Sequence, residues 1–282
     1  MLKERIRSGI LLGLAVIAGA IWLPTTAIVV ILVVLCALIQ SEFYRMLDAA
    51  RIPNFNIVGI IGGGVLVAAT AVSLMREDVG TLTGEWLVVL GFVLVVILRQ
   101  FPQKHNDQPI QTVGGTMLGF FYVAYLFNFL TKLLLGWSPH DGRLLIVYMI
   151  VVVKLSDVGA YFAGCSLGRH KLVPRISPAK TWEGCLGGAV TGLIASVVFW
   201  AVSHGSLHVV SFDLVDAVLL GILLPVMGIL GDLGESLFKR AAHMKDSGSM
   251  IHGMGGVFDV VDSVLFTAPV IYAYAYFFLE RL

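Results

Sequence analysis

Nine apolar runs, separated by short polar segments, constrain the fold of this chain more than any other feature. A run of about 17–25 apolar residues is long enough to cross the hydrocarbon core of a bilayer as a helix. Inside lipid, every backbone N–H and C=O must find its partner within the segment, which favours helices. The runs lie near 6–22, 25–41, 56–75, 85–99, 113–135, 144–164, 185–203, 213–231 and 257–279. We therefore predict an all-α integral membrane protein, a polytopic bundle of about nine transmembrane helices.

The composition supports this prediction, because a chain that is 58% hydrophobic and 13% charged is too apolar for an ordinary soluble domain. The formal net charge is +1, so overall charge favours no class of partner. Cys36, Cys165 and Cys185 lie in or beside apolar runs and form no CxxC pair, so we expect small buried thiols and no disulfide framework. The basic start indicates a retained signal-anchor helix.

Lysine and arginine residues tend to mark the cytoplasmic side of a membrane protein. With the N-terminus in the cytoplasm, fourteen of the nineteen fall on the inner side and four on the outer side, while Lys154 lies within the sixth run. This asymmetry predicts a multi-pass protein of the cell (inner) membrane whose polar segments 165–183 and 239–256 face the cytoplasm. We divide the chain into N-terminal transmembrane helices, about five, over 1–140 and a C-terminal half, 141–282, that carries both segments.

Small residues recur every four positions in two of the runs, at Gly59 and Gly63 and again at Gly184, Gly188 and Gly192. This spacing lets helix backbones approach closely. We favour packing within one chain over dimerisation, and a homodimer stays open as the alternative.

Four carboxylates lie at the membrane edges of the last two runs, and an acidic group in a bilayer is costly enough to suggest a function. Asp232 and Glu235 are three residues apart and share a helix face, as do Asp259 and Asp262. Oxygen ligands of this kind suit Mg²⁺, which binds through a few carboxylates plus substrate phosphates. The alternative is a set of helix caps and surface charges, and we favour the metal because the acids come in two spaced pairs.

Cations and glycines lie between the two acid pairs. Lys239, Arg240 and Lys245 form a basic cluster, and Gly255 and Gly256 precede the last run. A glycine-rich loop that enters a helix offers backbone N–H groups and the positive end of the helix dipole to a phosphate. The segment therefore predicts a phosphate site beside the metal.

The polar segment before the seventh run is also basic. Lys154 and Asp157 can pair on one helix face, either for insertion or for function. The loop at 165–183 would attract anionic lipid or a triphosphate. Within it, Glu183 either caps the next helix or assists a site, and capping is the better interpretation for a single residue.

These residues resemble the phosphatidate cytidylyltransferase (CDP-diacylglycerol synthase) family. The family's signature Ser-x-x-Lys-Arg, Lys-Asp, a glycine-rich turn and Asp-Arg-x-Asp is matched by Ser236, Lys239, Arg240, Lys245, Asp246, Gly248, Gly255, Gly256, Asp259 and Asp262. Its Gly-Asp-x-x-Glu-Ser is matched by Gly231, Asp232, Glu235 and Ser236. Its Asp-x-x-Ala-Tyr and Ser-Pro-x-Lys-Thr-x-Glu-Gly are matched by Asp157, Ala160, Tyr161, Ser177, Pro178, Lys180, Thr181, Glu183 and Gly184. The motifs cover the C-terminal half, and the first 140 residues match only as apolar helices.

Three positions depart from the family's signature. Met254 stands in place of a histidine, Val260 in place of an arginine, and His252 in place of a proline or glycine. Methionine cannot donate to phosphate and valine removes a cation, while both aspartates remain. The departures bear on rate or substrate choice, and we expect a live enzyme.

The resemblance implies a nucleotidyltransferase that makes CDP-diacylglycerol and pyrophosphate from CTP and phosphatidic acid during phospholipid biosynthesis. It implies Mg²⁺, with room for a second cation, held by Asp232, Glu235, Asp259 and Asp262. It implies catalytic roles for Asp232, Asp259, Asp262, Lys239, Arg240 and Lys245. It implies substrate contacts at Asp157, Ser177, Lys180, Thr181, Gly255 and Gly256. CTP, phosphatidic acid and the bilayer are the expected partners, with no nucleic acid.

Two alternatives differ in substrate or class. One is a CTP-dependent membrane enzyme that acts on another lipid phosphate or a polyprenol. The other is a non-enzymatic transporter, in which Lys154 and Asp157 would belong to an ion path. The clustering of charge at one membrane face and the lack of a visible inverted repeat argue against the transporter.

Overall fold

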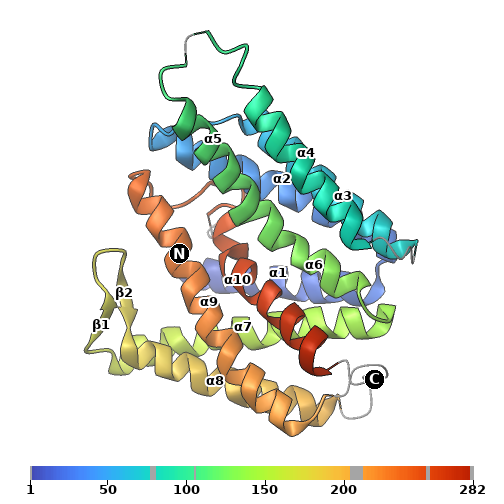
Figure 1. The fold of residues 1–282 in the computed structure, drawn as a ribbon. Helices are drawn as coiled ribbons and strands as arrows, with labels where there is room; N and C mark the ends of the chain where they lie inside the picture. Colours follow the sequence, from blue (N-terminus) through green and yellow to red (C-terminus); the bar gives the residue numbers. More distant parts are fainter. Residues whose placement is uncertain (1, 77–80, 105, 204–211, 252–254, 280–282) are drawn as a thin grey trace. The chain divides into compact units, whose positions relative to one another are not determined.

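The computed structural model describes residues 2–76, 81–104, 106–203, 212–251 and 255–279. Within these ranges the chain forms nine continuous helical segments and one short hairpin (Figure 1). The first five segments are α1 (Leu2–Trp22), α2 (Thr25–Ala49), α3 (Asn56–Met75), α4 (Thr81–Leu98) and a helix made of α5 (Pro109–Leu118), the π-helical turn η1 (Gly119–Tyr125) and α6 (Leu126–Leu135). The other four are α7 (Pro139–Leu167), α8 (Trp182–Val202), α9 (Leu214–Ala241) and α10 (Phe258–Tyr274), which the π-helical η2 (Ala275–Leu279) extends.

The helices confirm the prediction of an all-α, multi-span membrane protein. Each of the nine predicted runs falls on one helical segment. Among the described residues, seven of these segments are long and apolar enough to cross a membrane, while Gly13–Trp22 and Gly84–Leu98 are shorter apolar helices. The expectation of three buried thiols is confirmed for Cys36, but it is wrong for Cys165, which is exposed near the end of α7, and Cys185 is only half-buried.

Two helices extend beyond the apolar runs that predict them. The run at 25–41 continues as α2 to Ala49, and the run at 213–231 continues as α9 to Ala241. Charged residues do not end these helices, because apolar side chains still recur on one face, among them the buried Phe43 and Leu47 of α2. Several acidic and basic residues therefore lie on helices and not in loops.

The described chain divides into two compact units. Unit 1 comprises Met1–Gly136 and Phe238–Val261, and unit 2 comprises Trp137–Leu237 and Asp262–Leu282. The segment Phe238–Val261, which carries the basic cluster and the glycine-rich turn, is thus part of the same unit as the N-terminal helices. The sequence-based division into 1–140 and 141–282 stays a prediction.

Close glycine contacts shape the core of unit 1. Gln40 of α2 donates to the carbonyls of Gly59 at 3.0 Å and Gly119 at 3.4 Å. The Tyr44 hydroxyl donates to the carbonyl of Thr116 at 2.8 Å. A Cβ at Gly59 would meet the Tyr44 ring, so glycine is needed where α3 passes this side chain.

In unit 2, α7 and α8 lie side by side, and the hairpin between them projects from one end of the pair (Figure 1). A Cβ at Gly188 would lie 3.1 Å from Ala160, and one at Gly192 would meet Pro225 of α9. The glycines spaced every four residues therefore pack against other helices of the same chain, as the sequence predicts.

Candidate active site

The extension of α9 sets the geometry of the predicted acidic residues. Asp232 and Glu235 lie on this helix, three residues apart, and so point from the same face. Gly231 lies opposite the start of α10, where an added Cβ would come within 2.5 Å of the Asp262 carbonyl oxygen. The two backbones meet this closely because the residue before Asp232 has no side chain.

This approach brings three carboxylates of unit 2 together. Asp232, Glu235 and Asp262 each offer one oxygen atom, and these atoms all lie within 4.8 Å of one another. Glu235 is 1% exposed and Asp262 is 7% exposed, while Asp232 is half-buried. We call these three residues the acidic triad. They are three of the four residues that the sequence predicts as magnesium ligands.

Two lysines of unit 2 lie at or near the acidic triad. The Lys180 ammonium lies 2.8 Å from Asp232 Oδ2 and also donates to the carbonyl of Ile229 at 3.2 Å. Lys154 lies 3.4 Å from Asp157, as the sequence predicts, and donates to the Ser263 hydroxyl at 3.4 Å. Because Ser263 follows Asp262 directly, both lysines supply positive charge close to the three carboxylates.

Lys180 is presented by a hairpin that replaces the predicted irregular loop. Strand β1 (Lys171–Val173) pairs antiparallel with β2 (Ser177–Thr181), with Lys171 opposite Thr181. The Thr181 hydroxyl accepts from the Gly184 N–H at 3.1 Å and caps α8. Thr181 is therefore the N-cap residue of α8, and the capping expected of Glu183 holds only in part, because its carboxylate lies in the first turn and accepts from its own backbone N–H.

Glu183 also ties the hairpin to the start of α8. Its carboxylate accepts from the backbone N–H groups of Arg169 at 3.1 Å and His170 at 3.2 Å, and it lies 2.6 Å from the His170 ring. These bonds close the base of the hairpin. They fix the strand from which Lys180 reaches Asp232.

The fourth predicted ligand, Asp259, lies in unit 1, on the first turn of α10. It accepts from the Lys239 ammonium at 2.8 Å, from the Ser247 N–H at 3.0 Å and from the Gly256 N–H at 2.7 Å. The two N–H groups bond to Asp259 Oδ2, and the Ser247 hydroxyl lies 3.0 Å from the same oxygen. Asp259 is thus a carboxylate held by a cation and by backbone donors.

The glycine-rich turn uses its N–H groups within the chain. Gly256 donates to Asp259, and Gly255 donates to the carbonyl of Ile251 at 3.1 Å. Gly255 has a φ of 101°, a conformation that strongly favours glycine. In this structure the donors that the sequence predicts for phosphate hold the turn itself.

The remaining predicted residues have simpler surroundings. Arg240 is exposed in the last turn of α9, and Lys245 is exposed in the turn that follows this helix. Ser177 is half-buried on β2, and Val260 is half-buried on α10. His252 and Met254 lie outside the described residues.

Sequence reasoning missed one residue of this region, Glu42. It lies on α2 beyond the predicted run, is 0% exposed, and accepts from the Phe258 N–H at 2.8 Å. The available signal was a carboxylate directly after the apolar run 25–41, because an acidic side chain at a membrane helix often has a function. The motifs that carry the family resemblance start far downstream of Glu42 and do not include it.

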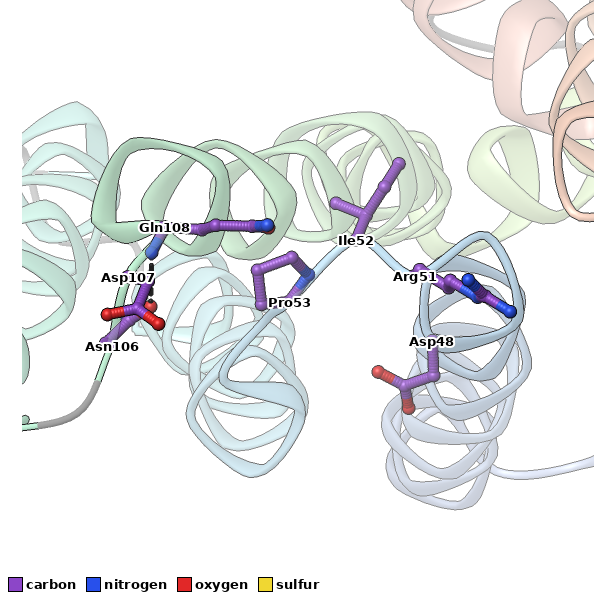
Figure 2. Close-up of a pocket in the computed structure, with 7 residues that line it drawn as sticks. All are labelled: Asp48, Arg51, Ile52, Pro53, Asn106, Asp107 and Gln108. Carbon is purple, nitrogen blue, oxygen red and sulfur yellow. Dashed lines mark hydrogen bonds between the residues drawn. The ribbon is translucent and has the colours of Figure 1, made fainter.

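The surface also carries an open pocket of about 400 Å³ on unit 1 (Figure 2). Its lining comes from the end of α2, the turn after it and the segment before α5. The residues are Asp48, Arg51, Ile52, Pro53, Asn106, Asp107 and Gln108. None of them is a predicted site residue, so the pocket plays no part in the candidate site.

Fold and chemistry together define a multi-span membrane protein with a metal-type carboxylate cluster beside lysines. Comparison with known proteins gives the family, because the model of the cytidylyltransferase family matches residues 3–278. The chain belongs to this family, and the resemblance seen in its motifs is confirmed.

Three relatives illustrate the match. The phosphatidate cytidylyltransferase of Bacillus subtilis is 30% identical over 275 residues, which are 96% of either chain. That of Haemophilus influenzae is 39% identical over 142 residues, 50% of this chain and 49% of that protein, so this match spans about half of each. The uncharacterized protein YnbB of Escherichia coli is 30% identical over 91% of this chain and 80% of its own length.

Proposed function

We propose that this protein is a phosphatidate cytidylyltransferase, which makes CDP-diacylglycerol and pyrophosphate from CTP and phosphatidic acid. The similarity to the Bacillus subtilis enzyme over 96% of both chains supports this function. The acidic triad is the observation that carries it, because nucleotidyl transfer in a membrane needs a metal-binding cluster next to phosphate-binding cations.

We propose that the acidic triad holds Mg²⁺. Its donor set consists of carboxylate oxygens, which Mg²⁺ prefers. Ligands on Mg²⁺ at about 2.0–2.1 Å lie within about 4 Å of one another. Oxygens that already lie within 4.8 Å of one another need only small side-chain movements to reach that geometry. The ion would neutralise the triphosphate and make its α-phosphorus more electrophilic. Asp259 stays in the proposal as the fourth acidic ligand or support, with room for a second cation.

We assign the cations of the chain to the phosphates. The Lys180 ammonium lies 2.8 Å from Asp232, a proposed metal ligand. It would therefore be close enough to a metal-bound substrate phosphate to donate to it in place of Asp232. Lys239, Arg240 and Lys245 would neutralise phosphate charge as it moves to the leaving group. Asp157, Ser177, Thr181, Gly255 and Gly256 are proposed to contact substrate.

The reaction that these residues would promote is a displacement at phosphorus. A phosphate oxygen of phosphatidic acid forms a bond to the α-phosphorus of CTP, the bond from that phosphorus to the bridging oxygen breaks, and pyrophosphate leaves. Such chemistry depends on positioning and charge neutralisation more than on acid–base help.

The test of this function is an assay of the purified protein with labelled CTP, phosphatidic acid and Mg²⁺. We expect CDP-diacylglycerol and pyrophosphate in equal amounts, with no product when Mg²⁺ is chelated. Turnover with a polyprenol phosphate but not with phosphatidic acid would favour the related CTP-dependent enzyme. Absence of CTP turnover together with Mg²⁺-independent ion or lipid flux would favour a transporter.

We also propose that the protein resides in the cell (inner) membrane with its active site facing the cytoplasm. The charge asymmetry of the sequence supports this orientation. Single cysteines replacing Ala179 and Ser249, which are both exposed, should resist an impermeant thiol reagent added outside intact cells that express a variant without the native cysteines. Rapid labelling of both from outside would overturn the orientation and, with it, access to cytosolic CTP.

A further inference from the structure

Glu42 is a fully buried carboxylate on α2. It is 0% exposed, and its neighbour Phe43 packs edge-on against Phe238 and Phe258 with ring centroids 5.1 and 5.8 Å apart. A buried carboxylate costs free energy unless several donors satisfy it. All residues named here belong to unit 1.

The donors to Glu42 come from the segment that carries the glycine-rich turn. Its Oε2 accepts from the Phe258 N–H at 2.8 Å, at the N-terminus of α10, and from the Ser247 hydroxyl at 3.1 Å. That hydroxyl also lies 3.0 Å from Asp259 Oδ2. A hydroxyl has a single hydrogen and an ionised carboxylate only accepts, so Ser247 links the two carboxylates as the shared donor of a three-centre hydrogen bond.

Two glycines of the same segment enclose the Glu42 carboxylate. A Cβ at Gly248 would lie 2.6 Å from Glu42 Oε1, and a Cβ at Gly256 would collide with Glu42 Oε2 and the Ser247 hydroxyl. The backbone can close around Glu42 only because both residues lack side chains. Part of the glycine richness of this turn therefore serves an internal carboxylate.

We infer that Glu42 is a positioning residue, which anchors Ser247 and the start of α10 at Phe258 to α2 and orients Asp259 through Ser247. Asp259 in turn accepts from Lys239, so the chain of contacts ends at a cation assigned to phosphate. The inference rests on the proposed function, because Asp259 and Lys239 affect turnover only if the protein transfers cytidylyl groups as proposed.

The state of the second carboxylate oxygen argues against a purely structural anchor. Among the described residues, Glu42 Oε1 has no hydrogen-bond partner. A buried carboxylate with one unbonded oxygen contributes little to the stability of the fold. Apolar side chains of similar volume often stabilise a buried site as well as a charged group does, or better. Orientation of a neighbouring carboxylate is a task that an apolar side chain cannot perform.

The experiment compares Glu42→Ala and Glu42→Gln in the full-length protein, purified in lipid nanodiscs. Glu42→Ala should lower kcat about ten- to a hundredfold, the range expected when a reacting group is misplaced by about an ångström. The KM for phosphatidic acid should change by less than about twofold. Glu42→Gln keeps an acceptor at the Oε2 position and should retain most of the turnover.

A spin label at Ser249→Cys reports on the turn independently of activity. Ser249 is exposed, so a label there should not disturb the packing. In a background without the native cysteines, the label should be ordered in the parent protein and in Glu42→Gln, and mobile in Glu42→Ala. Gln40→Ala is the matched control, because Gln40 is a buried polar residue of the same helix whose hydrogen bonds, to Cys36, Gly59 and Gly119, lead away from the glycine-rich turn. It should lower the unfolding temperature without mobilising the label.

The outcomes separate the inference from the proposed function. Without CTP turnover in the parent protein the proposed function fails, and the label still decides whether Glu42 holds the turn. An ordered label and near-normal kcat in Glu42→Ala would overturn the inference. A Glu42→Gln variant as slow as Glu42→Ala would also overturn it, because the charge and not the hydrogen bonds would then be required.

Discussion

Each unit holds a group of carboxylates, but the two groups differ in what satisfies them. In unit 1, Asp259 accepts from Lys239 and from two backbone N–H groups, so its charge is neutralised by the chain. In unit 2, Lys180 pairs with Asp232 at 2.8 Å, but one oxygen of each of the three acids lies within 4.8 Å of the others, and their mutual repulsion calls for more positive charge than this lysine supplies. A satisfied carboxylate suits the positioning of neighbours, and a crowded group suits the binding of a cation.

Asp262→Asn should have the largest effect, because it removes one charged ligand from the acidic triad without changing side-chain size. We expect the rate to fall by about a hundred- to a thousandfold, the usual loss when one group that stabilises the transition state is removed. The apparent Mg²⁺ requirement should rise. Measurement of turnover against Mg²⁺ concentration checks this. A variant that keeps the Mg²⁺ curve of the parent would assign the metal elsewhere.

Asp259→Asn should nearly abolish turnover, about a hundredfold, while the protein stays folded in membranes. An amide weakens the pairing with Lys239, which loses a charge-assisted bond worth about 1.5–3 kcal/mol. The Mg²⁺ dependence of this variant then distinguishes the two possible roles of Asp259, metal ligand and positioning group. A shifted requirement would make Asp259 a ligand, as the sequence suggests, and an unshifted one would make it a positioning group. Near-normal turnover at limiting Mg²⁺ would remove it from both roles.

The same contrast shows how far sequence reasoning reaches. All nine apolar runs become helices, because backbone satisfaction in lipid leaves little choice. The triad residues Asp232 and Glu235 are visible from their three-residue spacing, which fixes a shared face on any helix. Their meeting with Asp262 is not visible, because it depends on the contact of α9 with α10 at Gly231.

Residues that act over long sequence separations escape such reasoning. Glu42 bonds to Ser247 and Phe258, more than two hundred positions away, and no local pattern predicts that contact. The hairpin at 171–181 escapes for a different reason, since its short strands are fixed by Glu183 and Thr181 more than by alternation of apolar residues. In the glycine-rich turn, the sequence indicates the N–H donors but not the internal acceptors, Asp259 and Ile251, to which they bond in this structure.

Gly231→Ala should have a smaller effect, about tenfold on turnover. The added methyl would meet the Asp262 carbonyl and push α9 from α10, which spreads the acidic triad. Gly228→Ala is the matched control one turn earlier on α9, because its Cβ would have its nearest neighbour at 3.5 Å, an ordinary contact distance. Parallel measurements of turnover and unfolding temperature should show a loss in the first variant and little change in the second. Equal losses in both would show that the close approach at Gly231 has no special importance for the site.

The smallest effect is expected from the departures at Val260 and Met254. Val260 is half-buried in the first turn of α10, next to Asp259, so Val260→Arg would place a cation beside the satisfied carboxylate of unit 1. A new charge-assisted bond to phosphate would contribute about 1.5–3 kcal/mol if fully formed. We expect Val260→Arg together with Met254→His to keep or raise the rate on phosphatidic acid, and His252→Ala to lower it in the native background. Val260→Gln serves as the control for size without charge. A rate that collapses with the arginine but not with the glutamine would show that unit 1 tolerates no further cation, and that Lys239 and Asp259 already form a balanced pair.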